Sequence, residues 1–236
     1  MKSNDVLSLD YFVAGVPPGP LFKMSLDDLK EMVDLSKEDL SGLNPVVEVC
    51  LIGLVSHFEA FCKNMFAAVI NICPQILNNF CAKRPDTAIK VKDLLALDAY
   101  SKNKLGFLLS EKYDFGSAKD INSLYMDLLS ITPFSKNEME KYARLLNDRN
   151  LLVHHAGIYT MRYHEQAFKK QSVKNRVFFD SLVVRKKDFS NWAKFIENIV
   201  VKIINSSHSA LSEFIKNKKL KLPKENKKAL EFLKWY

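Results

Sequence analysis

Residues able to bind and cleave a phosphodiester gather in one stretch, residues 145–159. Within it, Arg149 and Asn150 are followed by three aliphatic residues and then by His154 and His155. An arginine carries a fixed positive charge, and a histidine titrates near neutral pH. RNA supplies its own nucleophile, the 2′-hydroxyl, so its cleavage needs a base, an acid and a cation beside the scissile phosphate. These residue types therefore indicate RNA cleavage.

Helical spacing places Asn150 and His154 side by side. At about 100° per residue, positions i and i+4 share one face of a helix. The amide of Asn150 can then orient the imidazole of His154, and the long side chain of Arg149 can reach the same place. We assign the acid–base role to His154, phosphate binding to Arg149, and orientation of His154 and a substrate hydrogen bond to Asn150. His155 is the alternative acid or base, because the pattern does not choose between the two histidines.

The string Arg149-Asn150-Leu151-Leu152-Val153-His154 resembles the R-x4-6-H signature, in its R-N-x-x-x-H form, of the HEPN superfamily of all-helical ribonucleases. Residues 54–61 are similar to the long first core helix of such proteins. The resemblance implies a homodimer in which two motifs line one composite active site, and a 2′,3′-cyclic phosphate product. It also implies that Glu59, a polar residue on an opposing helix, is a partner for the Arg149 guanidinium. A role in antiviral defence or in a toxin–antitoxin pair, with an antitoxin-like regulatory protein as partner, follows from the same resemblance.

The motif also has a structural interpretation. Arg149 and Asn150 can pair locally, while the two histidines end a helix, where positive charge interacts favourably with the helix dipole. The protein would then be a non-catalytic HEPN-like module for binding or dimerisation, or an unrelated helical scaffold.

The charge of the chain suits a polyanionic partner such as RNA. The 236 residues include 35 Lys and Arg against 27 Asp and Glu, a net charge of +8. A basic surface attracts nucleic acid, although solubility alone also accounts for such a charge. Arg162, Lys169 and Lys170, just after the motif, are candidate RNA-binding residues. The lysine-rich tail either contacts nucleic acid through its interleaved aromatics or docks on its own domain or a partner.

Scarce glycine and proline, seven and eight residues, favour an all-α fold. Ser135 and Glu138 predict a capping box for the motif helix, which Gly157 should end. β-Branched and aromatic residues at 177–184 predict a short extended or β-hairpin insertion. Helices are expected at about 25–36, 46–80 with a break at Pro74, 91–109, 120–131, 136–155 and 191–216.

The expected organisation is an N-terminal arm with a short helix (1–44), a HEPN-like antiparallel helical bundle (45–217) and a basic C-terminal tail (218–236). No residues have the spacing of a metal site or a phosphate-binding loop, so we expect no metal and no cofactor. The cysteine pattern is typical of buried free thiols in a reducing cytoplasm. Charged residues interrupt the apolar stretch at 45–73, and the first residues lack a hydrophobic block, so we expect a cytoplasmic protein that does not enter a membrane.

Overall fold

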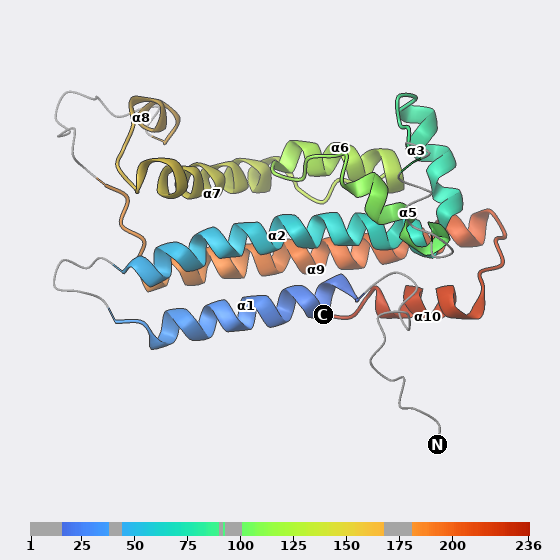
Figure 1. Ribbon diagram of the computed structural model, residues 1–236, viewed down its shortest axis with the longest axis horizontal. Coiled ribbons are helices and arrows are strands. Elements are labelled where there is room, and N and C mark those ends of the chain that lie inside the picture. The colour runs from blue at the N-terminus through green and yellow to red at the C-terminus, as the bar shows by residue number, and fades with distance from the viewer. Residues whose placement is uncertain (1–15, 38–43, 90–91, 93–100, 168–180) are drawn as a thin grey trace, which may run out of the picture. The chain divides into compact units, whose positions relative to one another are not determined.

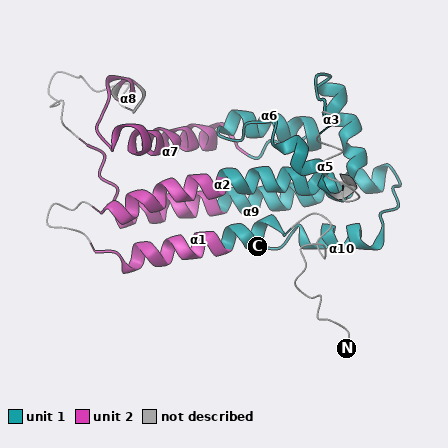
Figure 2. Cartoon of the chain, in the orientation of Figure 1, with its two compact units in different colours: residues 1–23, 59–133, 198–236 teal, residues 24–58, 134–197 magenta. Residues whose placement is uncertain are grey.

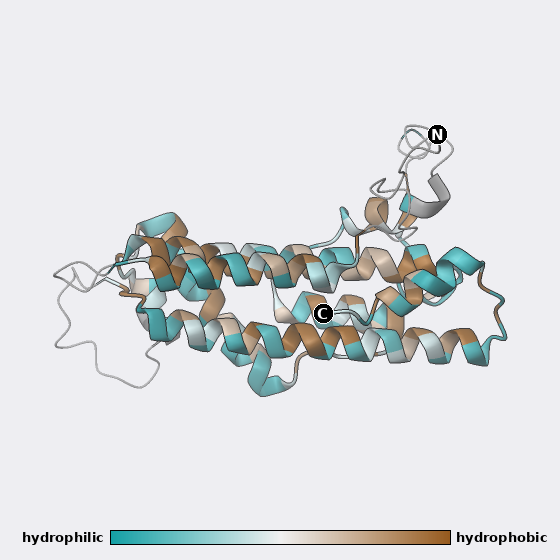
Figure 3. Cartoon of the chain, turned by 90° about the horizontal axis from the view of Figure 1, so that it is seen from below, coloured by the Kyte–Doolittle hydropathy of each residue, from teal (hydrophilic) through white to brown (hydrophobic). Residues whose placement is uncertain are grey.

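The computed structural model describes residues 16–37, 44–89, 92, 101–167 and 181–236, and its regular elements are helices (Figure 1). The all-α prediction is therefore confirmed. The elements are α1 (Pro18–Leu35), α2 (Pro45–Ile72), the 3-10 helix η2 (Pro74–Ile76), α3 (Leu77–Lys83), α5 (Ser101–Ser110), α6 (Ala118–Leu129), α7 (Lys136–His155), α8 (Met161–Ala167), α9 (Lys186–Asn217) and α10 (Lys224–Phe232). Hydrophobic and hydrophilic residues alternate along these helices (Figure 3), as in amphipathic helices that bury one face.

Contacts divide the chain into two compact units (Figure 2). Unit 1 comprises residues 1–23, 59–133 and 198–236, and unit 2 comprises residues 24–58 and 134–197. By these ranges, α1, α2 and α9 each contribute residues to both units. The expected division into arm, bundle and tail stays a prediction.

In unit 1, an aromatic core joins α2 to the helices that follow it. Phe66 packs edge-to-face against Phe80, Phe115 and Tyr125, with ring centroids 5.5, 5.6 and 6.2 Å apart. The hydroxyl of Tyr125 donates a hydrogen bond of 2.9 Å to the Cys62 carbonyl. The buried Tyr125 hydroxyl on α6 therefore has a hydrogen-bond partner in the backbone of α2.

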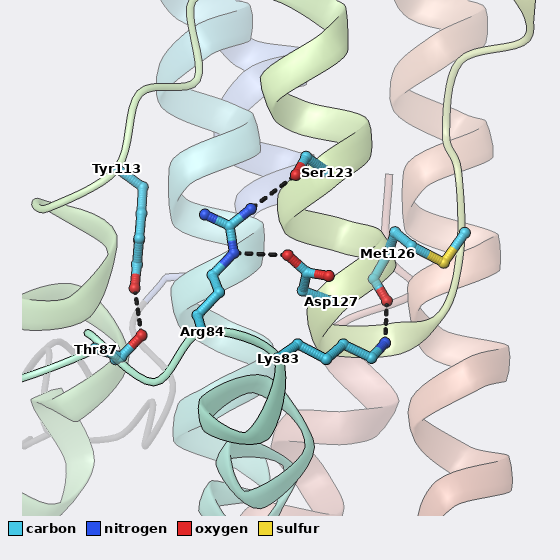
Figure 4. Close-up of polar contacts among 7 residues, drawn as sticks. All are labelled: Lys83, Arg84, Thr87, Tyr113, Ser123, Met126 and Asp127. Atoms are coloured by element: carbon cyan, nitrogen blue, oxygen red, sulfur yellow. Dashed lines mark hydrogen bonds and ion pairs between the residues drawn. The ribbon is translucent and has the colours of Figure 1, made fainter.

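Arg84, the residue just after α3, links that helix to α6 through polar contacts (Figure 4). Its Nε lies 2.6 Å from Asp127 Oδ2, and its Nη2 donates to Ser123 Oγ at 2.7 Å. The guanidinium also lies over the rings of Phe80 and Tyr113, 5.6 and 5.5 Å from their centroids. A planar guanidinium can make these polar and aromatic contacts together.

The C-terminal tail docks within unit 1, one of the two alternatives that its sequence allowed. Asn226 Nδ2 donates to the Ile72 carbonyl at 2.9 Å, and Ala229 and Leu233 are buried. Gly19 is required where the tail meets the start of α1, because a Cβ there would lie 2.0 Å from the Trp235 carbonyl oxygen. Contact between the tail and nucleic acid stays a prediction.

In unit 2, aromatic packing holds α7 against α2. Phe58 contacts Tyr142 with ring centroids 5.4 Å apart, and Phe134, before α7, contacts both rings. These buried rings support the motif helix. Elsewhere in the same unit, an ion pair of 3.0 Å joins Lys30 on α1 to Glu197 on α9.

Two helices begin earlier than the sequence suggests. α1 starts at Pro18, because prolines in a first turn sacrifice no intrahelical hydrogen bond. α9 starts at Lys186, before the expected start at 191, and the Asp188 carboxylate accepts from the Arg185 backbone N–H at 3.1 Å. The predicted break at Pro74 is confirmed.

The expected extended insertion is described only in part. Residues 177–180 lie outside the described residues, as do 91 and 93–100 of the expected helix at 91–109. Ser181 forms an isolated antiparallel bridge with Ile158, and Leu182 N–H donates to the Gly157 carbonyl at 2.8 Å. The extended residues therefore pair with the turn after the motif helix.

α2 is long and apolar enough to cross a membrane when judged by length and composition alone. It has 28 residues, and an 18-residue stretch of it has a mean hydropathy of 1.6 and is 44% buried. Leu54, Phe58 and Met65 on this helix are fully buried, which is also how a core helix of a soluble protein behaves. The absence of membrane contact stays a prediction.

Candidate functional site

The helix that carries the motif begins and ends with local signals. Ser135 N–H donates to Glu138 Oε2 at 2.7 Å, and Glu138 N–H donates to Ser135 Oγ at 3.4 Å, so the predicted capping box is confirmed. Ala156 is the C-cap, with φ 48°, and Gly157 follows with φ 79°. Two successive left-handed residues turn the chain sharply from α7 towards α8.

A pocket of about 220 Å³ lies where α7 ends and α8 begins. His154, His155 and Asn150 line it. Asn147, on the same side of α7 as Asn150 and His154, lines it as well. Thr160 and Arg162 complete its polar lining from the other side of the turn. Both histidines and Arg162 are exposed, so the pocket presents two imidazoles and a guanidinium to solvent.

Arg149 is not among the residues that line this pocket. It lies on the face of α7 that carries the buried side chains of Tyr142, Leu145 and Leu152, and its own Nε is buried. Five residues separate Arg149 from His154, which is about 140° around the helix axis. Among the residues that the structure describes, Arg162 is the cation that lines the pocket together with the histidines.

A hydrogen bond between Tyr163 and Asp148 fixes α8 beside α7. The Tyr163 hydroxyl donates to Asp148 Oδ1 at 2.7 Å, and the Tyr163 ring stacks on Tyr159 at 5.1 Å. Thr160 Oγ1 accepts from the Tyr163 backbone N–H at 3.2 Å. Because Arg162 is the residue before Tyr163, these contacts set where its side chain leaves α8.

Burial is the main cause of the pKa shifts of Asp148 and Tyr163. Burial raises the pKa of the Asp148 carboxyl, against the opposing effects of the Tyr163 hydrogen bond and the Arg144 charge. Burial and the bond to Asp148 raise the pKa of the Tyr163 hydroxyl. Tyr163 therefore keeps its proton at neutral pH and acts as the donor of the pair.

The remaining predicted site residues are Glu59, Lys169 and Lys170. Glu59 is a partly exposed residue of α2 in unit 1 and is not one of the residues that line this pocket of unit 2. Lys169 and Lys170 lie outside the described residues. Sequence reasoning missed Asn147 and Thr160; the spacing of Asn147 from His154, i to i+7, is a signal that would have found the first.

The pocket can bind an anion and move protons. Arg162 supplies a fixed positive charge, the imidazoles can accept or donate a proton, and the amides and hydroxyl supply directional hydrogen bonds. In the parts of the chain that the structure describes, no three His, Cys, Asp or Glu side chains come together as a metal site.

Fold and site thus define an all-α protein with an exposed histidine–arginine pocket at one helix end. Comparisons of the chain with protein-family models, with curated proteins and with solved structures found no match. The HEPN resemblance therefore rests on the residues of the motif.

Proposed function

We propose that this protein is a metal-independent endoribonuclease that cleaves RNA by attack of the 2′-hydroxyl on the adjacent phosphate. The observation that carries the proposal is that His154, His155 and Arg162 line one pocket. Such a set supplies a base, an acid and a cation without any further group. The net charge of +8 favours the approach of a polyanion.

In the proposed reaction, a neutral imidazole takes the proton of the 2′-hydroxyl while that oxygen forms a bond to phosphorus. The bond from phosphorus to the 5′-oxygen breaks, and the second histidine, as imidazolium, gives that oxygen a proton. The products are a 2′,3′-cyclic phosphate and a 5′-hydroxyl. His154 and His155 are the acid–base pair, and which of them takes each role is left to experiment.

Arg162 binds the phosphoryl oxygens in this proposal. Its guanidinium neutralises the charge that grows on them in the transition state, where a preorganised donor is most effective. Asn150 keeps its predicted tasks of orienting His154 and of hydrogen-bonding the substrate, and Asn147 is a second amide on the same face. The phosphate-binding role expected for Arg149 passes to Arg162, because Arg149 lies on the core face of α7.

The proposed localisation, biological role and partners of the protein follow from the HEPN resemblance. We propose a cytoplasmic enzyme that works in defence or in a toxin–antitoxin pair, assembles as a homodimer and is held in check by a regulatory protein. These points are proposals about partners and place, and the pocket chemistry does not depend on them.

The test is cleavage of an RNA with single-stranded and structured segments, in EDTA, by wild type and by single alanine variants of His154, His155, Arg162 and Arg149. Loss of an acid or base should lower the rate by about 10²- to 10⁴-fold. We expect this loss of rate in His154→Ala and in His155→Ala. Arg162→Ala should weaken cleavage. Arg149→Ala should lower activity only as far as it destabilises the fold. His57→Ala, an exposed histidine of α2, is the matched control.

The products should carry 2′,3′-cyclic phosphates. Equal activity in all the variants would mean that a contaminating nuclease is being measured. A well-folded wild type that leaves RNA intact would overturn the proposal in favour of the non-catalytic helical module.

A further inference from the structure

A second cavity of about 310 Å³ adjoins the histidine pocket in unit 2. Asn147 and Tyr163 line both cavities, so the two cavities are neighbours. A single ligand such as a nucleotide could therefore place one part in each cavity.

The second cavity is lined by both apolar and polar side chains. Leu51 and Val184 are buried apolar side chains in its lining. Trp192 on α9 adds a large, partly exposed indole, with Lys141 Nζ 5.7 Å from its ring centroid. A flat aromatic surface in a cavity suits a stacked nucleobase, because every base has a π-face.

The polar lining includes one cation and two carboxylates: Arg144, Asp148 and Asp188. Arg144 and Asp188 lie near enough to Asp148 to influence its pKa in opposite directions. Each carboxylate is held by a hydrogen bond, Asp148 by Tyr163 Oη at 2.7 Å and Asp188 by the Arg185 backbone N–H at 3.1 Å. A carboxylate has about four lone-pair sites, so both retain capacity to accept from a ligand.

We propose that this second cavity is the base subsite of the enzyme and that it binds guanine. The inference rests on the proposed ribonuclease function. Guanine presents two neighbouring donors, N1–H and the N2 amino group, beside the O6 acceptor. The carboxylates of Asp188 and Asp148 accept from these donors, Arg144 donates to O6, and Trp192 provides the stacking surface.

The other bases match this set of groups less well. Adenine has an acceptor at N1 and one amino group, so it meets the carboxylates with an unpaired lone pair. Cytosine offers one amino donor, and uracil offers one N–H between two carbonyls. A site with two carboxylates and one arginine leaves fewer polar groups unpaired with guanine than with any of these bases.

The arrangement also assigns the bond that is cut. The nucleotide whose base fills the second cavity carries the 2′-hydroxyl that attacks, and its own 3′-phosphate extends past Asn147 and Tyr163 to His154 and Arg162. Cleavage is therefore expected on the 3′ side of guanosine.

The experiment has a cleavage arm and a binding arm. In the first, cut sites are mapped on an RNA that contains every dinucleotide, with wild type, Asp188→Asn and Glu140→Gln. Asp188→Asn keeps an oxygen for the Arg185 N–H but replaces an acceptor with a donor, and Glu140→Gln is a matched change at an exposed residue of α7. In the second, calorimetry compares 2′-deoxyguanosine 3′-monophosphate with the adenosine, cytidine and thymidine analogues, using wild type and His154→Ala.

Wild type should cut after guanosine at least tenfold faster than after other bases, a discrimination typical of bidentate base contacts. Asp188→Asn should lower that ratio about tenfold, and Glu140→Gln should leave it unchanged. His154→Ala should lose cleavage but still prefer the guanosine nucleotide.

The two proposals can fail separately. RNA cut without base preference, with no effect of Asp188→Asn, overturns the guanine subsite while the ribonuclease stands. Preferential binding of the guanosine nucleotide without cleavage supports the subsite and overturns the ribonuclease. If the wild type neither cleaves RNA nor binds the guanosine nucleotide preferentially, both proposals are overturned.

Discussion

The difference between Arg149 and Arg162 is decided by the helix face on which each residue lies. Arg149 shares the face of Tyr142, Leu145 and Leu152, all buried. A long cationic side chain can leave such a face only by bending around the helix, at the cost of the contacts of its methylene groups. Arg162 begins on α8, whose position is fixed by its neighbour Tyr163, and it needs no such bend.

At the same scale, Asp148 should make stability depend on pH. Its carboxyl has a raised pKa in the folded state because it is buried, so the folded protein holds this proton more tightly than the unfolded chain does. The free energy of unfolding should therefore fall as pH rises from the ordinary pKa of an aspartate, 3.8, through the raised value.

The variant Asp148→Asn cannot titrate, so it should not lose stability as pH rises, and its amide keeps an oxygen that accepts from the Tyr163 hydroxyl. Urea unfolding from pH 4 to pH 8 should show the variant gaining stability relative to wild type as pH rises. Glu140→Gln, at an exposed carboxyl of the same helix, is the control. Parallel curves for Asp148→Asn and wild type would show that burial at this position does not govern the titration.

At the scale of elements, short sequence signals predict helix ends well when both partners of a contact are neighbours in the chain. The capping box of α7 needs only Ser135 and Glu138, and it forms as expected. The start of α9 depends instead on the Asp188 carboxylate, which accepts from the Arg185 backbone N–H, and the helix begins at Lys186 and not at the expected 191. The contact between α3 and α6 depends on residues more than thirty positions apart in the chain, because Arg84 binds Ser123 and Asp127. No local sequence pattern predicts this contact.

Arg84→Lys should loosen α3 from α6. Lysine keeps the charge but loses the planar fork that contacts Asp127 and Ser123 together, so we expect a loss of about 1–3 kcal/mol in the free energy of unfolding. Lys83→Gln is the neighbouring control: Lys83 Nζ donates one exposed hydrogen bond of 2.9 Å to the Met126 carbonyl, and its loss should cost less than about 0.5 kcal/mol. Urea unfolding measures both, and equal values would mean that the Arg84 contacts contribute nothing beyond charge.

At the scale of the whole molecule, the HEPN resemblance implies a homodimer in which two motifs line one composite active site. In this structure one chain brings His154 and His155 to the same pocket, so a single protomer holds both histidines of the proposed acid–base pair. The dimer stays a prediction, and its catalytic necessity can be tested.

Mixing the inactive His154→Ala and His155→Ala proteins should not restore RNA cleavage if each pocket works alone. Sedimentation of wild type at the assay concentration reports whether a dimer is present in the same experiment. Recovery of about a quarter or more of wild-type activity in a mixture that sediments as a dimer would instead establish a composite site shared by two chains.

The sequence by itself determined the all-α class, the break at Pro74, the capped motif helix and the shared face of Asn150 and His154. Each of these follows from residues within a few turns of one another, where helical periodicity and capping chemistry act directly. The tertiary structure alone decided that Arg162 joins the histidines, that Arg149 lies on the core face, and that Asn226 docks the tail on the end of α2. Those outcomes depend on how α7, α8 and α10 pack, and packing is set by the complementarity of surfaces that are distant in the chain.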